Sequence, residues 1–350
     1  MSTWCVVLAG GVGSRFWPLS TSRRPKQLLP LASDRPLLRD SLDRMAPLAD
    51  PAHTLILTNS TLVDPIRALA PEVPAANVIA EPRPAGTAAA LTWAASVIAL
   101  TDSTESVMLS IHADWAVADP DGFRTVLARA AEIARAEKAL VTVGVVPSRA
   151  DPGYGYIQPG VPLDGTSASS SARRVARFVE KPDSAHAEAM VRAGCLWNSG
   201  IFVWQAGDFL DEVRAHCHEV APSLDAHEDD LAAFFESITK TVSVDVGVLE
   251  RSSRVVVIPG DFGWDDVGTW AALRRVRQAD AAGNVTAGPV HAVRAGNNVV
   301  HAEGNEVVLF GVSNLVVVTH RGLTLVTTMD YAGDLKELLA ALPARVRERE

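Results

Sequence analysis

The sequence WCVVLAGGVGSRFWPLSTSRRPKQLLPL, at residues 4–31, decides the fold of this chain. Residues 4–9 are an apolar run of the kind that a buried parallel strand shows. Directly after this run come three closely spaced glycines, Gly10, Gly11 and Gly13. Glycines that follow a strand let backbone N–H groups approach a polyphosphate, because no Cβ blocks the approach.

Two cationic side chains, Arg15 and Lys26, follow the glycines and would supply the positive charge that a triphosphate requires. Two familiar phosphate-binding motifs do not fit. A P-loop needs a glycine–lysine pair, which does not follow here, and a dinucleotide fingerprint needs a third glycine where Phe16 stands. The stretch predicts nucleotide chemistry in a loop of another kind.

The composition excludes several other classes of protein. With 350 residues the chain can bury a full core, and it has an ordinary globular balance of 48% hydrophobic and 21% charged residues. A net charge of −9 argues against a nucleic-acid surface. Only three cysteines occur, the N-terminus shows no signal-peptide pattern, and no apolar run reaches the length of a membrane span. We therefore expect a cytoplasmic protein that binds neither nucleic acid nor membrane.

Short β-branched runs alternate with Ala-rich helical stretches up to about residue 277, which predicts an α/β fold. We expect a Rossmann-like, mixed but mostly parallel sheet flanked by helices, with ligands at the carboxyl ends of the strands. The expected strands are residues 4–9, 53–58, 77–80, 106–111, 139–145, 173–179, 200–204 and 254–258. The expected helices are residues 37–45, 87–100, 122–136, 184–193, 206–216, 223–237 and 269–277.

The character of the chain changes near residues 278–288. Residues 290–328 read as short Val-rich strands separated by small polar turns, and a helix is expected near residues 331–342. We predict a catalytic domain at residues 1–280 and a small, all-β, β-helix-like domain at residues 281–350, used for packing or subunit contact. We also expect a homodimer. The Ser-rich residues 166–172 are expected to form a surface loop.

Carboxylates follow two of the expected strands. Asp114 stands just beyond residues 106–111, and Asp265 and Asp266 follow the strand at residues 254–258. Mg²⁺ prefers hard carboxylate oxygens and keeps waters and phosphates as its other ligands. A lone aspartate is usually solvated or a helix cap, but two acidic strand ends facing one crevice would form a metal clamp.

Several polar segments suit sugar or base recognition. Gly86 and Thr87 open a helix after Glu81-Pro82, where Thr87 is an N-cap candidate and the backbone could also read a nucleobase edge. Glu180 and Lys181 lie at a strand end and are either solvated charges or partners of a hydroxyl-rich ligand. Asn198 offers a donor and an acceptor, as sugar recognition demands. Gly155 would let a backbone N–H lie against a sugar ring, although a plain turn also fits.

Taken in order, these segments resemble the sugar-1-phosphate nucleotidyltransferases, most closely their mannose-1-phosphate guanylyltransferase branch. The matching segments are LAGGVGSRFWPLS at 8–20, RPKQLL at 24–29, EP at 81–82, HAD at 112–114, GYGYI at 153–157, FVEKP at 178–182, WNSGIFVW at 197–204, SVDVGVLE at 243–250 and GWDDVGTW at 263–270. The resemblance implies transfer of GMP from GTP to α-D-mannose 1-phosphate, with Mg²⁺ as the cofactor.

The resemblance also implies a role for each matching residue. Arg15 and Lys26 would act on the triphosphate, and Asp114 and Asp266 would hold the metal. The implied nucleotide-binding residues are Leu8, Gly10, Gly11, Gly13, Glu81, Gly86 and Thr87. The implied sugar-binding residues are Gly155, Glu180, Lys181, Asn198 and Asp245. Where the family reads N-T-A-P-A after Glu-Pro, this chain has GTAAA at 86–90, which leaves the base open.

Three alternatives stay beside this interpretation. A nucleotidyltransferase for another base or sugar 1-phosphate would share the whole site. A metal-dependent glycosyltransferase would share the sheet and an acidic metal site without needing Arg15 and Lys26 on a leaving pyrophosphate. A non-catalytic sugar-nucleotide sensor would keep the glycine loop and lose a metal carboxylate. Longer family members carry an isomerase domain after the β domain, and we expect this chain to be monofunctional.

Overall fold

The computed structural model describes residues 2–11, 13–163 and 171–347. Residues 166–170 of the expected serine-rich loop lie outside this range. Contacts divide the chain into two compact units, neither of them a continuous stretch. The first unit contains residues 1–10, 42–112 and 119–262, and the second contains residues 11–41, 113–118 and 263–350. The expected division at residue 280 stays a prediction.

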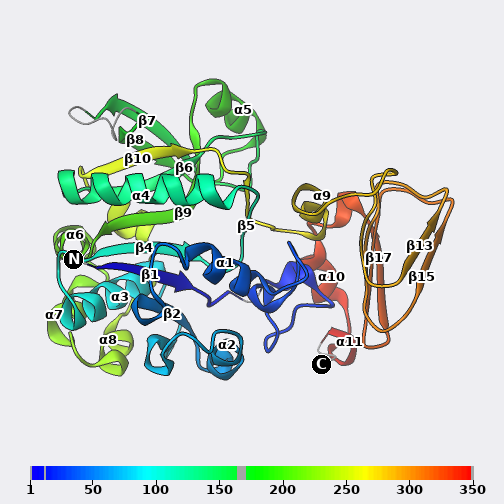
Figure 1. The fold of residues 1–350 in the computed structure, drawn as a ribbon, viewed down its shortest axis with the longest axis horizontal. Helices are drawn as coiled ribbons and strands as arrows, with labels where there is room; N and C mark the ends of the chain where they lie inside the picture. The colour runs from blue at the N-terminus through cyan, green and yellow to red at the C-terminus, as the bar shows by residue number, and fades with distance from the viewer. Residues whose placement is uncertain (1, 12, 164–170, 348–350) are drawn as a thin grey trace. The chain divides into compact units, whose positions relative to one another are not determined.

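A nine-stranded sheet forms the centre of the first unit, in the order β3-β2-β1-β4-β9-β6-β10-β8-β7 (Figure 1). Strands β1 to β4, β6 and β10 lie close to their expected positions. The strands are β1 Thr3–Leu8, β2 Thr54–Asn59, β3 Val78–Glu81, β4 Val107–His112, β6 Leu140–Val145, β7 Tyr156–Pro162, β8 Arg173–Val179, β9 Leu196–Gln205 and β10 Val255–Gly260.

The sheet is mixed, as expected. Strands β3, β2, β1 and β4 pair in parallel, and so do β6 and β10. Strand β9 runs antiparallel to both of its neighbours β4 and β6, and β8 runs antiparallel to β10 and β7. The ends of β1 and β4 therefore meet at one edge, where Leu8 pairs with His112.

Helices pack on this sheet because the apolar side chains on its faces are stabilised when they are removed from water. Helices α3 and α6 pack against each other, α3 packs on β1 and β2, and α4 packs on β4, β6, β9 and β10. The helices are α2 Val63–Leu69, α3 Thr87–Thr101, α4 Pro120–Glu137, α5 Ser184–Arg192, α6 Ala206–His216, α7 Ala221–Ala226 and α8 Leu231–Ser237. Short helical turns, η3 Pro51–His53, η4 Ser60–Leu62, η5 Ala75–Asn77 and the π-helix η7 Asp245–Leu249, complete this unit.

Two helix predictions for the first unit need correction. The single helix expected at 223–237 is two helices, because the side chain of Asp230 accepts a hydrogen bond from the Ala233 N–H and caps the new helix α8. Thr87 is not an N-cap. The cap position of α3 is Gly86, and the Thr87 hydroxyl accepts a hydrogen bond from the Val244 N–H at 2.9 Å.

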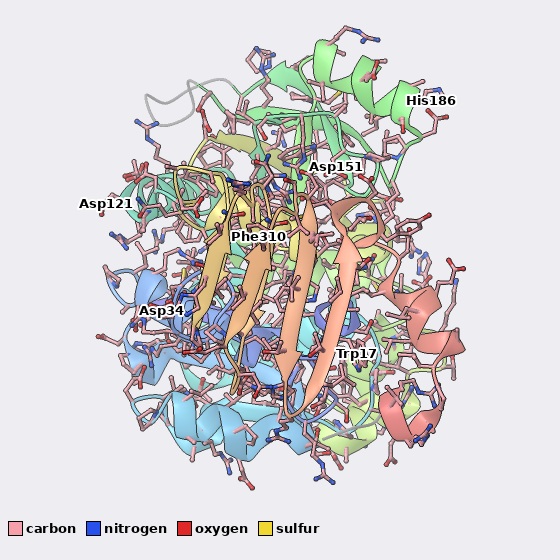
Figure 2. All side chains as sticks on the ribbon, turned by 90° about the vertical axis from the view of Figure 1, so that its right-hand side faces the viewer. Trp17, Asp34, Asp121, Asp151, His186 and Phe310 are labelled. Carbon is pink, nitrogen blue, oxygen red and sulfur yellow. The ribbon has the colours of Figure 1, made fainter. Side chains whose placement is uncertain are left out.

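Short parallel strands build the C-terminal part of the second unit. Strands β12, β14 and β16 stack in parallel in one sheet, which β17 closes in antiparallel fashion, and β13 and β15 pair in parallel in another. Figure 2 shows these strands side by side, with the exposed Phe310 of β15 labelled. The strands are β12 Val285–Ala287, β13 Val290–Val293, β14 Val299–Ala302, β15 Val307–Phe310, β16 Leu315–His320 and β17 Leu323–Thr328.

Buried asparagines join the turns between these strands. The Asn284 side-chain oxygen accepts from both the backbone and side-chain N–H groups of Asn298, at 3.1 and 2.9 Å. The Asn298 oxygen in turn accepts from the Leu315 N–H at 2.9 Å. Because both amides are buried, each needs these partners, and the ladder fixes the register of successive strands.

The rest of the second unit surrounds a core that includes Phe16, Trp17, Leu29 and Trp270. Its elements are η1 Ser14–Phe16, η2 Lys26–Leu28, β5 Ala116–Val117, β11 Trp264–Asp265, η8 Trp270–Ala272, α9 Leu273–Val276, η9 Met329–Tyr331, α10 Leu335–Ala341 and α11 Ala344–Arg347. The helix expected at 269–277 is the short pair η8 and α9. Helix α1, Leu37–Met45, continues from this unit into the first.

Among the described helices, all are too short or too polar to cross a membrane. The three cysteines, Cys5, Cys195 and Cys217, are buried free thiols. Burial raises the pKa of Cys5 to about 12, so this thiol is inert.

Candidate active site

The second unit brings Lys26, Asp114 and Asp266 together. The Lys26 Nζ donates to Asp114 Oδ2 at 2.9 Å and to the backbone carbonyl of Asp266 at 2.5 Å. Lys26 is buried, with 7% of its surface exposed, whereas the Asp114 side chain is 37% exposed. A buried ammonium needs compensating charge and hydrogen-bond acceptors. The Asp114 carboxylate provides the charge, and the Asp266 carbonyl provides a second acceptor. Three predicted residues from distant parts of the sequence thus meet at one point.

A small antiparallel ribbon places the two aspartates. Strand β5 pairs with β11, with Ala116 opposite Asp265 and Val117 opposite Trp264. Asp114 lies just before β5 and Asp266 just after β11. The ribbon therefore brings together the segments that carry the two carboxylates, although each of its strands is only two residues long.

The adjacent carboxylates Asp265 and Asp266 have different roles. Asp265 is buried, and it accepts from Arg275 Nε and Nη2 at 2.5 and 3.0 Å and from the Val267 N–H at 2.8 Å. Val267 has a φ of 47°, a left-handed conformation that a β-branched residue rarely adopts. The Asp265 carboxylate therefore holds a strained loop in shape, whereas Asp266 meets Lys26 through its backbone carbonyl.

The predicted glycine loop lies beside Lys26. Gly13 has a φ of 66°, and a Cβ added there would lie 2.3 Å from the Lys26 Cβ, so only glycine fits. A Cβ added at Gly10 or Gly11 would meet no described atom within 4 Å, which leaves space next to the backbone there. Arg15 belongs to the turn η1, and its side chain is exposed.

The predicted sugar-binding residues come together in the first unit. The Asn198 side-chain amide donates to Asp245 Oδ1 at 2.7 Å, and the Asn198 N–H donates to the Gly155 carbonyl at 2.8 Å. A Cβ added at Gly155 would lie 2.7 Å from Glu180 Oε2, so the carboxylate of Glu180 lies against this glycine. Lys181 pairs with Glu180 at 2.6 Å on the surface. The cluster offers carboxylates and an amide, which suit the hydroxyl groups of a sugar.

Two members of this cluster were not assigned a role from the sequence. A Cβ added at Gly200 would lie 3.1 Å from His112 Nε2, which places the imidazole beside the part of β9 that carries Asn198. Burial raises the pKa of Asp245, with Glu180 adding to the effect and His112 opposing it. Burial, Asp245 and Glu180 together raise the pKa of Glu250. The sequence signals available were the position of His112 at the end of β4 and the membership of His112 and Glu250 in the matching segments HAD and SVDVGVLE.

The predicted base-binding residues lie next to the same segment. The Val242 carbonyl accepts from the Ala88 N–H at 3.3 Å and leaves no room for a Cβ at Gly86, whose φ is 88°. Together with the Thr87 contact to Val244, this docks the start of α3 on the chain that leads to Asp245. Glu81 ends β3, and burial raises its pKa to about 7.

The chemistry of Asp114 and Asp266 fits a magnesium ion that also binds phosphates. Their carboxylates are hard oxygen donors, and Mg²⁺ commonly takes one or two protein carboxylates with waters and substrate phosphates. The described residues contain no group of three or more His, Cys, Asp or Glu side chains able to hold a metal. A site of this kind would hold the ion together with a nucleotide rather than alone.

Comparison with known proteins shows the family of this chain. The family model described as nucleotidyl transferase matches residues 4–283. Mannose-1-phosphate guanylyltransferase of Escherichia coli (strain K12) is 36% identical over 97% of this chain and 73% of its own length. The alginate biosynthesis protein AlgA of Pseudomonas aeruginosa is 33% identical over 98% of this chain and 72% of its own length.

Solved structures agree as well. A crystal structure described as mannose-1-phosphate geranyltransferase from Thermus thermophilus is 34% identical, with a TM-score of 0.88 over 97% of this chain and 99% of that one. A UDP-glucose pyrophosphorylase complexed with UDP-glucose shares the fold at 14% identity, with a TM-score of 0.51 over 79% of this chain and 97% of that one. The fold and the site thus define a nucleotidyltransferase. The chain belongs to the nucleotidyl transferase family, in its mannose-1-phosphate guanylyltransferase branch.

Proposed function

We propose that this enzyme transfers GMP from GTP to α-D-mannose 1-phosphate, giving GDP-mannose and pyrophosphate. The observation that carries the proposal is the contact of the buried Lys26 with the Asp114 carboxylate and the Asp266 backbone carbonyl, next to Gly13 of the glycine loop. The names of the relatives that match nearly the full chain support the same substrates.

An oxygen of the sugar phosphate attacks the α-phosphorus of GTP in line, and the bond to the pyrophosphate oxygen breaks. The second pKa of a phosphate monoester is about 6, so the nucleophile is already ionised near neutral pH. No side chain is needed as a general base. The difficulty of the reaction is the repulsion between two anions, so fixed positive charge is what the protein has to supply.

Four side chains and the glycine loop are proposed to supply or organise this positive charge. Lys26 and Arg15 stabilise the negative charge that develops on the leaving pyrophosphate, and the N–H groups of the glycine loop bind its oxygens. Asp114 and Asp266 would hold a magnesium ion. That ion, when bound, neutralises phosphate charge as a Lewis acid.

Residues of the first unit recognise the sugar and the base. Glu180, Asn198 and Asp245 accept and donate hydrogen bonds to the mannose hydroxyls, next to the backbone of Gly155. An ionised Glu81 accepts hydrogen bonds from the Watson–Crick edge of guanine, where two N–H donors lie side by side. The backbone of Leu8, Gly10, Gly86 and Thr87 surrounds the nucleoside.

A substrate panel tests the proposal. GTP, ATP, UTP and dTTP are each incubated with mannose 1-phosphate or glucose 1-phosphate and Mg²⁺, and released pyrophosphate is measured. We expect the fastest release with GTP and mannose 1-phosphate, and Mg²⁺ chelation to abolish it. Release of a nucleoside diphosphate from a sugar nucleotide, without pyrophosphate, would instead favour a glycosyltransferase.

Three further features belong to the proposal. We place the enzyme in the cytoplasm, where free thiols such as the three buried cysteines stay reduced. We propose that the two parallel strand stacks of the second unit are coils of a short β-helix, in keeping with the asparagine ladder. We also propose a homodimer, which sedimentation at micromolar concentration would test.

A further inference from the structure

A cluster of charged side chains lies on the C-terminal strands of the second unit, and the proposed reaction does not use it. His301 belongs to β14, His320 belongs to β16, and Glu303 follows β14 with its N–H bonded to the Thr319 carbonyl at 3.0 Å. One carboxylate oxygen, Glu303 Oε2, lies 3.0 Å from His320 Nδ1 and 4.0 Å from His301 Nε2.

The same oxygen reaches the loop that leads to Lys26. Glu303 Oε2 lies 3.4 Å from Nη1 of Arg24, which stands two residues before Lys26 in the sequence. The cluster therefore connects the Val-rich strands, 279 positions further along the chain, with the segment that carries the buried lysine.

The charges in the cluster favour the contact between Arg24 and Glu303. Burial lowers the pKa of His301 to about 4, so this imidazole is neutral at pH 7. Burial raises the pKa of Glu303, but Arg24 and His320 lower it by more, so that it lies below its usual value. Glu303 is therefore ionised at neutral pH. The His320 side chain, only 5% exposed, fixes the carboxylate on its inner side, and the half-exposed Arg24 meets it from the outside.

Arg24 is rigidly coupled to the backbone before Lys26. Its N–H donates to the Thr21 carbonyl at 3.2 Å and to the Thr21 hydroxyl at 3.0 Å, and the Thr21 N–H donates to the Arg24 carbonyl at 3.0 Å. Pro25 follows with its fixed φ, and Lys26 begins η2 against Gly13. Holding the Arg24 side chain thus restricts the hydrogen-bonded turn from Thr21 to Arg24, which Pro25 joins to the Lys26 backbone.

We infer that Glu303, anchored by His320, is a positioning residue that holds Lys26 in place through Arg24. This inference rests on the proposed function. The C-terminal strands then contribute to the rate of nucleotidyl transfer without touching a substrate. A partly exposed ion pair contributes little to stability, whereas a misplacement of about 1 Å at a catalytic group can cost up to about 100-fold in rate. The effect should therefore appear in kinetics and not in folding.

The test compares Glu303→Gln, Glu303→Asp and the control Glu306→Gln, whose glutamate is exposed on the same part of the chain. Pyrophosphate release gives kcat and both KM values, and thermal unfolding reports stability. We expect Glu303→Gln to lower kcat about five- to twentyfold, with the KM for mannose 1-phosphate and the unfolding temperature unchanged. Glu303→Asp should recover most of the rate, and Glu306→Gln should match the wild type.

The Lys26→Ala background separates positioning from a general structural effect. If Glu303 acts through Lys26, Glu303→Gln causes no further loss of kcat in that background. Arg24→Gln combined with Glu303→Gln should be no slower than the slower single variant. Should Glu303→Gln prove unstable, His320→Ala is measured in the same two backgrounds, with the same expected pattern.

Three results would overturn the inference. These are a wild-type kcat for Glu303→Gln, an equal fold-loss in the wild-type and Lys26→Ala backgrounds, or an Arg24→Gln variant that raises the KM for GTP when Glu303→Gln does not. The last result would mean that Arg24 binds the nucleotide itself. A Lys26→Ala enzyme with wild-type turnover would instead remove the proposed role of the lysine, so the two failures are distinguishable.

Discussion

At the scale of single residues, the pair Asp265-Asp266 illustrates what a sequence leaves open. Both carboxylates follow a strand, and the sequence predicts a metal ligand at this place without any property that separates the two positions. The separation comes from Arg275, which binds Asp265 in bidentate fashion, and from Lys26, which contacts Asp266. Because both partners are brought in by folding, only the structure shows that Arg275 holds the Asp265 carboxylate and that Lys26 donates to the Asp266 backbone carbonyl.

Asparagine substitutions should distinguish these two roles. We expect Asp266→Asn to lower kcat about 10²–10³-fold with unchanged stability, because it removes a charge near the reacting phosphates. Asp265→Asn should lower the free energy of unfolding by about 1–3 kcal/mol, because the partly exposed Arg275 loses its charged, buried partner. Urea unfolding and pyrophosphate release measure the two effects. Equal losses of turnover in two equally stable variants would contradict the division.

Glu81 gives the proposed reaction a pH dependence. Burial raises its pKa to about 7, so below that pH the carboxyl group is mostly protonated in the free enzyme. Guanine donates hydrogen bonds from its Watson–Crick edge, and only the ionised carboxylate can accept both. We therefore expect the KM for GTP to be constant above pH 7 and to rise about tenfold for each pH unit below it.

The variant Glu81→Gln is the control for this pH dependence. It cannot titrate, so its KM for GTP should be higher than that of the wild type and nearly constant between pH 5.5 and about 8. The raised pKa also makes the free energy of unfolding depend on pH, because the folded protein favours the protonated acid. The stability from Glu81 is therefore full below its ordinary pKa near 4.5 and is lost as the pH rises to about 7. A wild-type KM that is flat through this range would argue against Glu81 in guanine binding.

At the scale of elements, local patterns predicted most of the fold. Helices α1 and α6 begin and end at the residues expected, because the hydrophobic pattern and the breaks around them agree. Strand β7, YIQPGVP, was missed because two prolines and a glycine are unusual inside a strand. It lies at the end of the sheet order, where proline is tolerated. Strands β5 and β11 have two residues each, too few for any periodic signal.

Gly155 immediately precedes β7 and lies against Glu180 and Asn198. A substitution there tests the proposed role of this cluster in sugar binding. Gly155→Ala places a methyl group 2.7 Å from the present position of Glu180 Oε2, so that carboxylate must move. We expect the KM for mannose 1-phosphate to rise about tenfold, the equivalent of one displaced hydrogen bond to a charged group. The KM for GTP should stay the same. Gly333→Ala, where an added Cβ meets no described atom within 4 Å, is the matched control.

At the scale of the whole molecule, the sequence predicted a set of site residues, three of which are in contact in the structure, and could not predict how they meet. Strand ends suggested Asp114 and Asp266, because ligands gather at the carboxyl ends of parallel strands. Lys26 is 88 positions from Asp114 and 240 from Asp266, and their contact depends on the pairing of β5 with β11. Nothing local to these residues specifies that pairing. The participation of Glu303 is equally remote from any motif.

The central claim is that Lys26, held beside Asp114 and Asp266, stabilises the leaving pyrophosphate. Turnover of Lys26→Ala with GTP, mannose 1-phosphate and Mg²⁺ tests it most directly, with Lys336→Ala as an exposed control. Asp114 is partly exposed and stays solvated without the lysine, so the variant should fold. We predict a fall in kcat of about 10²–10³-fold with an unchanged unfolding temperature. Turnover equal to that of the wild type and of Lys336→Ala would contradict the account.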